Sequence, residues 1–419
     1  MKKSAAFAIC AFAAVSAFAW EHVNTNSNYF IDESTTISED LAPYRKNIHI
    51  NDQGNFAAGE EAKWKLSEPT TVIVAENVNV TSKVYNYFKE TEVDGTFGIG
   101  KTKLTFMGNN TITAGDMILT DAAEVYANNA TFNLSGDNAL RFAGENCKAV
   151  FNGGVVNANR VYVQSNTGSL TFNGTKVSTS AVSTSGAMSG ITAKDFTLTL
   201  KGNSTLTLTD SSIQYGNYSA NSQFHGKIIV QDGSKIESTN SKYKLFTASD
   251  ITVSGANSAI TTAAVLSKST ITLADGANIS SSTVSANDIV VGANSQLLSS
   301  EISAANSLTV NAASTVSASN INFNKLTIVF NEDFSSGEES TFDLSDIFGE
   351  STSVALSALE NANAFTVMGT NGEWSLAATN VGEDGTVSFT IGAQVPEPST
   401  VAAIFGALAL GLAIYRRRK

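Results

Sequence analysis

The stretches "ITLADGANIS" (271–280), "IVVGANSQLL" (289–298) and "LTVNAASTVS" (308–317) are copies of one pattern. Each opens with two apolar residues separated by one residue, turns through Gly, Asn, Asp or Ala, and returns to an apolar residue. Counted from the first residue of each copy and continued past the ten residues quoted, apolar or small side chains stand at offsets 2, 8, 13 and 15 in all three copies. Because side chains two apart on a strand point the same way, each copy predicts about three short strands joined by two turns.

The pattern extends over much of the chain. "ITVSGANSAI" begins at Ile251, so the starts Ile251, Ile271, Ile289 and Leu308 are almost evenly spaced. Seven further starts fit less closely: Leu104, Phe132, Ala149, Leu170, Leu198, Ile228 and Leu326. A period of roughly 20 residues is typical of a solenoid, in which each repeat forms one coil. Eleven coils stacked about 4.8 Å apart would make a rod of roughly 50 Å.

The predicted fold class is therefore all-β, a single-stranded parallel β-helix with about 18–30 residues per coil. The density of Asn, Ser, Thr and Gly disfavours helices, and the apolar spacing is two rather than three or four. A β-sandwich remains an alternative, although it does not require offsets this regular.

The ends of the chain differ from the repeats. We expect residues 20–103 to form an N-terminal β cap or first coils, 104–330 the solenoid, and 331–394 a C-terminal antiparallel β cap, because an open solenoid end would expose strand edges. Residues 353–362 are the helix candidate of this cap. The pairs Asn371-Gly372 and Asp384-Gly385 lie between apolar strands and predict hairpins.

The segment 1–19 has the features of a signal peptide with a signal helix. Lys2 and Lys3 precede an apolar run, and Ala17-Phe18-Ala19 has the small-x-small form of a cleavage site. Cleavage after Ala19 by the secretion machinery removes Cys10 and leaves Cys147 as the sole thiol, so no internal disulfide is expected. Cys147 is predicted to be a small buried hydrophobic residue.

The charge balance excludes one class of partner. The chain has 26 basic and 38 acidic residues, and six of the basic residues lie in the two terminal segments. The exported part keeps 20 basic against 38 acidic residues, a net charge of about −18. Nucleic acid is excluded as a partner, because its recognition needs a basic surface.

The chain ends in "VPEPSTVAAIFGALALGLAIYRRRK" (395–419). Two prolines block helix formation just before an uncharged stretch at 399–415, which would span about 26 Å as a transmembrane helix. Cations at the end of such a helix stay on the cytoplasmic side. The motif residues are Pro396, Glu397 and Pro398, and the basic cluster is Arg416, Arg417, Arg418 and Lys419.

This order of motif, apolar helix and basic cluster resembles the PEP-CTERM sorting signal. The resemblance implies recognition by exosortase, a membrane-embedded protease-transpeptidase, after a transient stay in the inner membrane. It further implies cleavage near the motif and delivery to the cell surface or extracellular matrix of a bacterium that makes exopolysaccharide. A plain C-terminal membrane anchor is the alternative. The β-solenoid body is similar to an autotransporter passenger.

Because β-helix proteins include polysaccharide lyases and hydrolases, we examined the carboxylates. Asp250 and Asp288 directly precede first strands two coils apart, which predicts about 10 Å between them in one column. That is slightly wide for an inverting pair, so we expect solvated turn residues. Asp232 and Asp275 stand in Asp-Gly turns, where aspartate bonds its own backbone.

Other chemistry-bearing residues are scattered. The exported part holds three arginines far apart in sequence, Arg45, Arg141 and Arg160, and the histidines His22, His49 and His225 are isolated. Gly98, Gly100 and Lys101 in "GIGK" lack the rest of a nucleotide fingerprint and predict a turn. We therefore expect no catalytic site, no metal and no cofactor.

Two surfaces remain. Seven acidic residues lie within 332–350, and their spacing matches no calcium loop, so a solvated cap face is favoured while weak calcium binding stays open; they are Glu332, Asp333, Glu338, Glu339, Asp343, Asp346 and Glu350. Segments such as "STLTLTD" (204–210) and "NTIT" (110–113) expose hydroxyls suited to sugars. We expect the threonines not to form a constant column, which disfavours ice binding.

Together these features predict an exported, exosortase-sorted β-solenoid with a structural or adhesive role, associated with extracellular polysaccharide. A carbohydrate-active β-helix enzyme is the alternative, and a membrane-anchored spacer is a weaker one.

Overall fold

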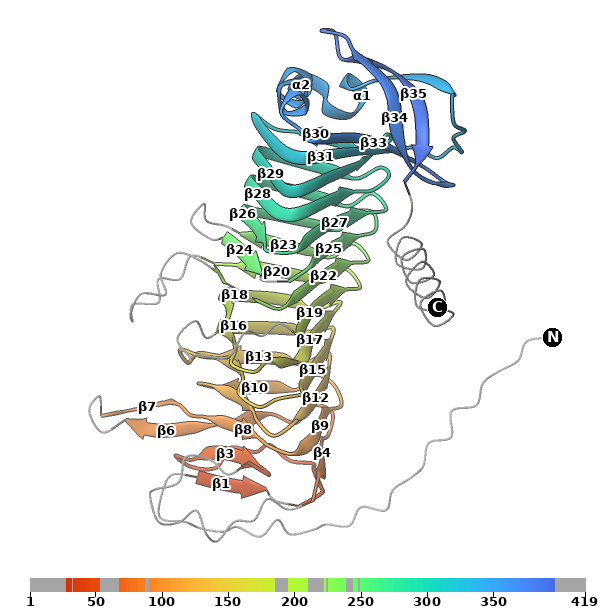
Figure 1. Cartoon of the computed structure of the whole chain (residues 1–419). Coiled ribbons are helices and arrows are strands. Elements are labelled where there is room, and N and C mark those ends of the chain that lie inside the picture. Colours follow the sequence, from red (N-terminus) through yellow and green to blue (C-terminus); the bar gives the residue numbers. More distant parts are fainter. Residues whose placement is uncertain are drawn as a thin grey trace, which may run out of the picture.

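The computed structural model describes residues 28–31, 33–52, 68–86, 90–184, 195–209, 222–223, 225–238, 244–247 and 249–395. The signal peptide with Ala17 and Ala19, residue His22, the sorting motif and the predicted transmembrane helix lie outside these residues. The described chain is an all-β parallel solenoid of about 12 turns with a C-terminal cap, so the predicted fold class is confirmed for this part of the chain (Figure 1).

Each coil contributes a strand to up to three faces of the solenoid. The first face consists of β2 (Thr35–Ile37), β4 (Thr70–Val74), β9 (Thr102–Phe106), β12 (Glu124–Asn128), β15 (Cys147–Asn152), β17 (Thr167–Asn173), β19 (Asp195–Lys201), β22 (Lys227–Gln231), β25 (Ile251–Ser254), β27 (Thr270–Ala274) and the C-terminal parts of β28 (Asn278–Val291), β29 (Gln296–Asn311) and β31 (Asn320–Val329).

The second face consists of β5 (Val80–Thr81), β10 (Thr111–Ala114), β13 (Thr131–Leu134), β20 (Thr205–Leu208), β23 (Lys235–Ser238), β30 (Thr315–Ser317) and the N-terminal parts of β16 (Val155–Val163), β18 (Lys176–Thr184), β26 (Ala259–Ser267), β28 and β29. The third face consists of β1 (Asn28–Ile31), β3 (Asn47–Ile50), β8 (Phe97–Ile99), β11 (Met117–Leu119), β14 (Leu140–Phe142), β21 (Ser222–Gln223), β24 (Lys244–Thr247) and the remaining parts of β16, β18, β26, β28, β29 and β31.

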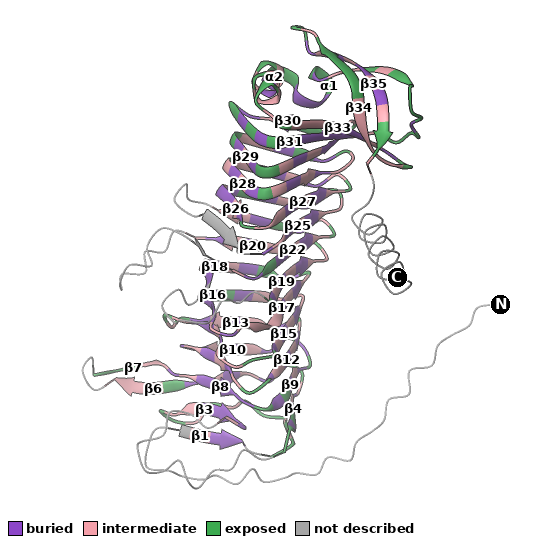
Figure 2. Cartoon of the chain, viewed as in Figure 1, coloured by how far each residue is buried: buried purple, intermediate pink, exposed green. Residues whose placement is uncertain are grey.

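The register reproduces the sequence offsets. Ile271, Ile289 and Leu308 stand side by side on the first face. Offset 8 gives the buried column Ile279, Leu297 and Val316 on the second face. Offsets 13 and 15 give two buried columns on the third face, Val284–Ile302–Ile321 and Ala286–Ala304–Phe323. The inward positions were therefore predicted correctly, and Figure 2 shows the resulting alternation of buried and exposed residues.

Two details of the repeat were wrong. Phe132 is not the start of a coil: it pairs with Ile112 on the second face, and Val125 occupies the first-face position next to Leu104. The first-face column also runs from Thr35 to Val72 to Leu104, and both of these intervals exceed the longest coil that the sequence predicted. Insertions after a strand lengthen a coil without disturbing its stacking.

The core changes character along the axis. Phenylalanines fill the coils of β9 to β17, where the ring centroids of Phe106 and Phe132 lie 5.4 Å apart and those of Phe132 and Phe151 5.0 Å apart. From Ile251 onward the first-face column is Ile, Ile, Ile, Leu and Leu, and the coils between these positions are short and nearly equal in length. A coil with fewer residues encloses less space, which aliphatic side chains fill.

The turns after the first face use residues that tolerate a left-handed backbone. Asn203, Asp232, Asn257, Asp275 and Asn294 have φ between 55° and 66°. Asn and Asp adopt this conformation more readily than other non-glycine residues. This explains the recurrent Gly, Asn and Asp of the repeat.

A two-stranded antiparallel hairpin, β6 (Lys83–Asn86) and β7 (Thr91–Asp94), projects from an early coil (Figure 1). Beside it the guanidinium of Arg45 lies 4.8 Å from the ring centroid of Tyr44 and 4.3 Å from that of Tyr85.

The C-terminal cap continues the first face and covers the other two. β33 (Ala364–Gly369) pairs in parallel with β31 and antiparallel with β34 (Gly372–Val381). β34 pairs antiparallel with β35 (Thr386–Gln394), and β35 pairs antiparallel with β32 (Glu339–Asp343). Both predicted hairpins are present. The predicted helix is α2 (Thr352–Glu360), preceded by α1 (Ser345–Phe348) and the short η1 (Gly349–Ser351).

Helix α1 covers the open edge of β30. Ile347 and Phe348 of α1 are buried, and the following η1 also contacts β30: its Ser351 Oγ accepts the backbone N–H of Ala318 at 2.9 Å. Within the residues that the structure describes, no helix is long and apolar enough to cross a membrane.

Candidate functional site

The cap leads directly to the sorting segment. β35 ends at Gln394, and the backbone N–H of Val395, the last described residue, donates to the carbonyl of Glu373 at 2.7 Å. Pro396, Glu397, Pro398 and the basic cluster Arg416–Lys419 follow, outside the described residues. In the sequence, the motif therefore begins directly after the last residue of the folded cap, Val395.

Asp250 and Asp288 stand in one outward column on the first face, with Thr270 between them. Each carboxylate accepts a hydrogen bond from a serine of the next coil, Ser269 Oγ at 2.8 Å and Ser307 Oγ at 2.6 Å. The predicted separation by two coils is confirmed. These contacts link coils and point the carboxylates at neighbours rather than at each other.

The "GIGK" segment was predicted to be a turn, but Gly98 lies within β8, and only Gly100 and Lys101 follow the strand. His49 Nδ1 lies 2.9 Å from Asp52 Oδ2, and Thr120 Oγ1 donates to Asp52 Oδ1 at 3.0 Å. A Cβ on Gly98 would lie 2.1 Å from Asp52 Oδ2, and one on Gly100 would lie 1.8 Å from the carbonyl oxygen of Asn51. Glycine is required at both positions because neighbouring groups approach the backbone closely. His49 appeared isolated in the sequence, but in the structure its ring contacts the carboxylate of Asp52.

The register also brings together two arginines that are far apart in sequence. Arg141 and Tyr162 are neighbours on the third face. Arg141 Nε donates to Gln164 Oε1, the guanidinium of Arg160 lies 4.1 Å from the Tyr162 ring centroid, and Arg160 Nε donates to Ser183 Oγ at 2.6 Å. We call Arg141, Arg160, Tyr162, Gln164 and Ser183 the arginine cluster. Its members come from successive coils. They are far apart in the sequence, and the strand register is what brings them together.

Asp116 lies beside this cluster. Burial raises the pKa of its carboxyl, opposed by the backbone N–H groups of Asn138 and Ala139 and by the charge of Arg141. A half-buried carboxyl near an arginine is the type of group that proton-transfer chemistry uses.

Cys147 is fully buried in β15, and burial raises the pKa of its thiol to about 11. It packs as the predicted small hydrophobic residue.

The acidic segment 332–350 is spread over the cap. Ser345 N–H donates to Asp343 Oδ1 at 2.7 Å and lowers the pKa of that carboxyl, while Glu338 Oε2 accepts the N–H of Ser335 at 2.9 Å. Among the described residues, no three His, Cys, Asp or Glu side chains group so that they could hold a metal ion.

The threonines share one column of the first face, but the column is not constant, in agreement with the sequence-based expectation, because Val150, Ile229 and Val290 interrupt it. This column contains Thr171, Thr199, Ile229, Thr252, Thr272, Val290 and Thr309, and it continues at the cap with the buried residues Thr327 and Thr366. The next outward column is not uniform, because it carries Lys148, Lys227, Asp250 and Asp288. A flat uncharged array, as ice binding requires, is therefore absent from this described face.

Asparagines form a second ladder at the edge of the same face. Asn173 Nδ2 donates to Asn152 Oδ1 at 3.1 Å, and Asn152 Nδ2 donates to Asn128 Oδ1 at 3.2 Å. Stacked amides of this kind bond to one another along the axis.

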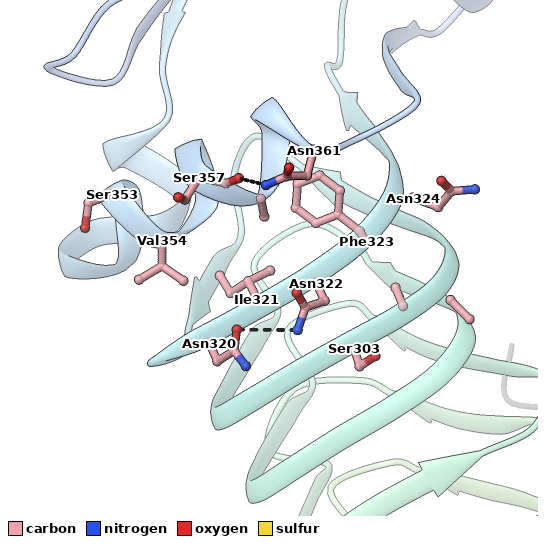
Figure 3. A pocket seen from close by; sticks show the side chains of 13 residues that line it. Ser303, Asn320, Ile321, Asn322, Phe323, Asn324, Ser353, Val354, Ser357 and Asn361 are labelled. Carbon is pink, nitrogen blue, oxygen red and sulfur yellow. Dashed lines mark hydrogen bonds between the residues drawn. The ribbon is translucent and has the colours of Figure 1, made fainter.

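A groove of about 690 Å³ lies between the last coil and α2 (Figure 3). One wall is the outer side of β31 with Asn320, Asn322 and Asn324, and the other is α2 with Ser353 and Ser357, followed by Asn361. Among the described residues, no charged side chain lines it. No pattern in the sequence indicated the groove, because it forms where the cap meets the repeat.

A family model for the PEP-CTERM protein-sorting motif matches residues 394–419. Comparisons with curated proteins and with solved structures gave no match. The match covers the tail that follows β35, and the resemblance inferred from Pro396, Glu397, Pro398 and the terminal cations is confirmed. The chain therefore carries a PEP-CTERM sorting motif on a β-solenoid body, which implies exosortase processing and sorting of the exported protein to the cell surface.

Proposed function

We propose that this protein is a non-catalytic structural or adhesive element of the bacterial cell surface or extracellular matrix, and that it associates with extracellular polysaccharide. The observation that carries the proposal is the sorting motif on a rigid stack whose outward columns present hydroxyls and amides. Such groups donate and accept hydrogen bonds without charge, as polysaccharide hydroxyls do.

The length of the stack supports a role as a scaffold. Twelve turns at about 4.8 Å would extend roughly 55–60 Å and repeat the same polar columns along that length. A polymer lying along the axis would meet many weak contacts at once, and their combined effect exceeds that of any single contact.

The direct test compares producing cells with cells that lack the gene. We expect the cells without the protein to retain less polysaccharide at their surface, and the protein released from producing cells to sediment with the isolated polysaccharide. Equal retention together with no co-sedimentation would contradict the proposal.

The intact mass of the protein recovered from the cell surface tests the finer statement about processing. We expect a species that begins at Trp20 and ends between Pro396 and Ser399, with or without an added group. A recovered species that still ends at Lys419 would instead support the alternative of a membrane-anchored spacer.

A carbohydrate-active enzyme is the second candidate, and Asp116 beside the arginine cluster is the observation that favours it. Asp116, whose carboxyl has a raised pKa, directly precedes β11, and Arg141 of β14 and Tyr162 of β16 stand on the two coils that follow. Incubation of the released protein with the native polysaccharide, followed by chromatography of the products, separates the candidates. Chain shortening that Asp116→Asn and Arg141→Gln abolish would favour the enzyme.

A further inference from the structure

The groove between β31 and α2 presents polar side chains from two directions. Asn320, Asn322 and Asn324 alternate along the outer side of β31, and all three are exposed. Ser353, Ser357 and Asn361 follow at every fourth position, which places them along one side of α2 and its C-terminal end. Figure 3 shows Asn320 and Asn322 along β31 beside Ser353, Ser357 and Asn361 of α2 and its end, while the side chain of Asn324 points away from the helix.

Several of these groups keep hydrogen-bonding capacity. Asn322 Nδ2 donates to Asn320 Oδ1 at 3.4 Å, and Asn361 Nδ2 donates to the carbonyl of Ser357 at 2.9 Å. Within the described chain these bonds leave Asn320 Nδ2, Asn322 Oδ1 and Asn361 Oδ1 without a protein partner. The groove thus offers donors and acceptors together, which a ligand carrying hydroxyls can use in both directions.

The floor of the groove is apolar. Ala304 and Phe323 come from neighbouring coils, and Val354 and Ala358 come from α2. A sugar ring has a rim of hydroxyls and two faces made of C–H groups. Polar walls over an apolar floor match this distribution, and the volume falls within the usual range of small-ligand sites, about 300–1,000 Å³.

The surrounding charge selects among polysaccharides. Residues 331–395 contain eleven acidic side chains and no basic one. An anionic polymer would be repelled by this cap. A cationic polymer would be attracted by the field, but no carboxylate of the described chain lines the groove to pair with its charges.

We propose that the groove between β31 and α2 binds a short segment of a neutral polysaccharide. The inference rests on the proposed association with extracellular polysaccharide. It locates the binding site at the C-terminal end of the stack, on the third face. There the amides of β31 and the hydroxyls of α2 hold one segment of chain against Phe323 and its apolar neighbours.

The test is calorimetric titration of the surface-released protein with neutral gluco-, manno-, galacto- and xylo-oligosaccharides. We expect at least one series to bind with an affinity that changes little between low and high salt. Asn322→Ala and Asn361→Ala should each weaken binding about tenfold, the effect of losing a well-placed hydrogen bond. Asn157→Ala is the matched control, because Asn157 is an exposed solenoid asparagine outside the groove.

Ser357→Trp provides a second variant that fills the groove without removing a buried contact, since Ser357 is exposed. It should abolish oligosaccharide binding while the melting temperature stays unchanged. If the groove variants and Asn157→Ala bind equally well, or if binding disappears at high salt, the groove assignment is wrong. Sedimentation of the unaltered protein with native polysaccharide tests the wider function separately, and its failure would contradict that function instead.

Discussion

Buried serines at the corner between the first and second faces connect successive coils through the backbone. Ser204 Oγ accepts the N–H of Thr175, Ser234 Oγ that of Ser204, and Ser258 Oγ that of Gly233, each at 3.0 Å. All three serines are almost completely buried. A buried N–H needs a hydrogen-bond partner. Each of these serines supplies one to the preceding coil, and therefore stabilises that coil as well as its own turn.

Replacement of Ser204 by alanine tests this connection. We expect Ser204→Ala to lower the free energy of unfolding by about 1–3 kcal/mol, because the N–H of Thr175 loses its acceptor in a buried site. Ser295→Ala is the control: Ser295 is equally buried, but within the described chain its hydroxyl contacts only the carbonyl of Ala293, at 3.5 Å. Chemical denaturation followed by circular dichroism measures both, and equal losses would contradict the argument.

Asp116 predicts a pH dependence. Its pKa is raised by burial, so the folded state binds a proton more tightly than the unfolded state does. The resulting destabilisation is absent below pH 3.8, the pKa of this carboxyl in the unfolded state. It grows as pH rises and is complete above the pKa of Asp116 in the folded state. Asp116→Asn should therefore stabilise the protein at neutral pH and have no such effect near pH 3. Denaturation curves at both pH values measure the difference, and a stabilisation that is equal at the two would exclude this origin.

At the scale of elements, the regular part of the solenoid was predictable and its irregular parts were not. Short coils without insertions keep constant offsets, so their inward columns follow from the sequence. Val125 and Phe132 both begin apolar-x-apolar segments, and only strand pairing shows which one starts the coil. Threonine often follows the coil start directly, as in Thr252 and Thr272, but isoleucine or valine takes this place in other coils, so the lack of a constant column was predictable from the sequence.

The groove and the arginine cluster could not be predicted in the same way. The groove requires α2 to pack beside β31, a contact between a non-repeating helix and the last coil. The arginine cluster requires the pairing of Arg141 with Tyr162, which depends on the length of one particular coil. Turn chemistry, in contrast, located the cap hairpins because Asn-Gly and Asp-Gly act locally.

Helix α1 carries a prediction of its own, because it covers the free edge of β30. Phe348→Ala removes a fully buried ring from this contact and should cost about 3–5 kcal/mol. An uncovered strand edge pairs with other chains, so we expect the variant to associate as its concentration rises. Light scattering detects this. Val381→Ala, at an exposed position of the same cap, should remain unchanged, and a monomeric Phe348→Ala at high concentration would refute the edge-covering role.

At the scale of the whole molecule, each coil pairs with its neighbours along the axis. Stability is then approximately a sum of local terms. Leu297→Ala, in the core of β29 between Ile279 and Val316, should loosen β28, β29 and β30 while β9 to β15 keep their protection. Hydrogen exchange with mass spectrometry resolves these regions. The adjacent Leu298, which points outward, gives the control Leu298→Ala, and a loss of protection along the entire stack would contradict local stability.

The described chain enters the stack at β1 and leaves it at the cap on the opposite end (Figure 1). A pulling force applied between the two ends therefore acts first on a terminal coil, whose release leaves the next coil intact. One of the short coils lengthens by about 55–60 Å when drawn out, more than tenfold its height in the stack. A cell-surface element built in this way yields to load in steps and absorbs mechanical work at each one, so that a tether to a matrix would extend before it broke.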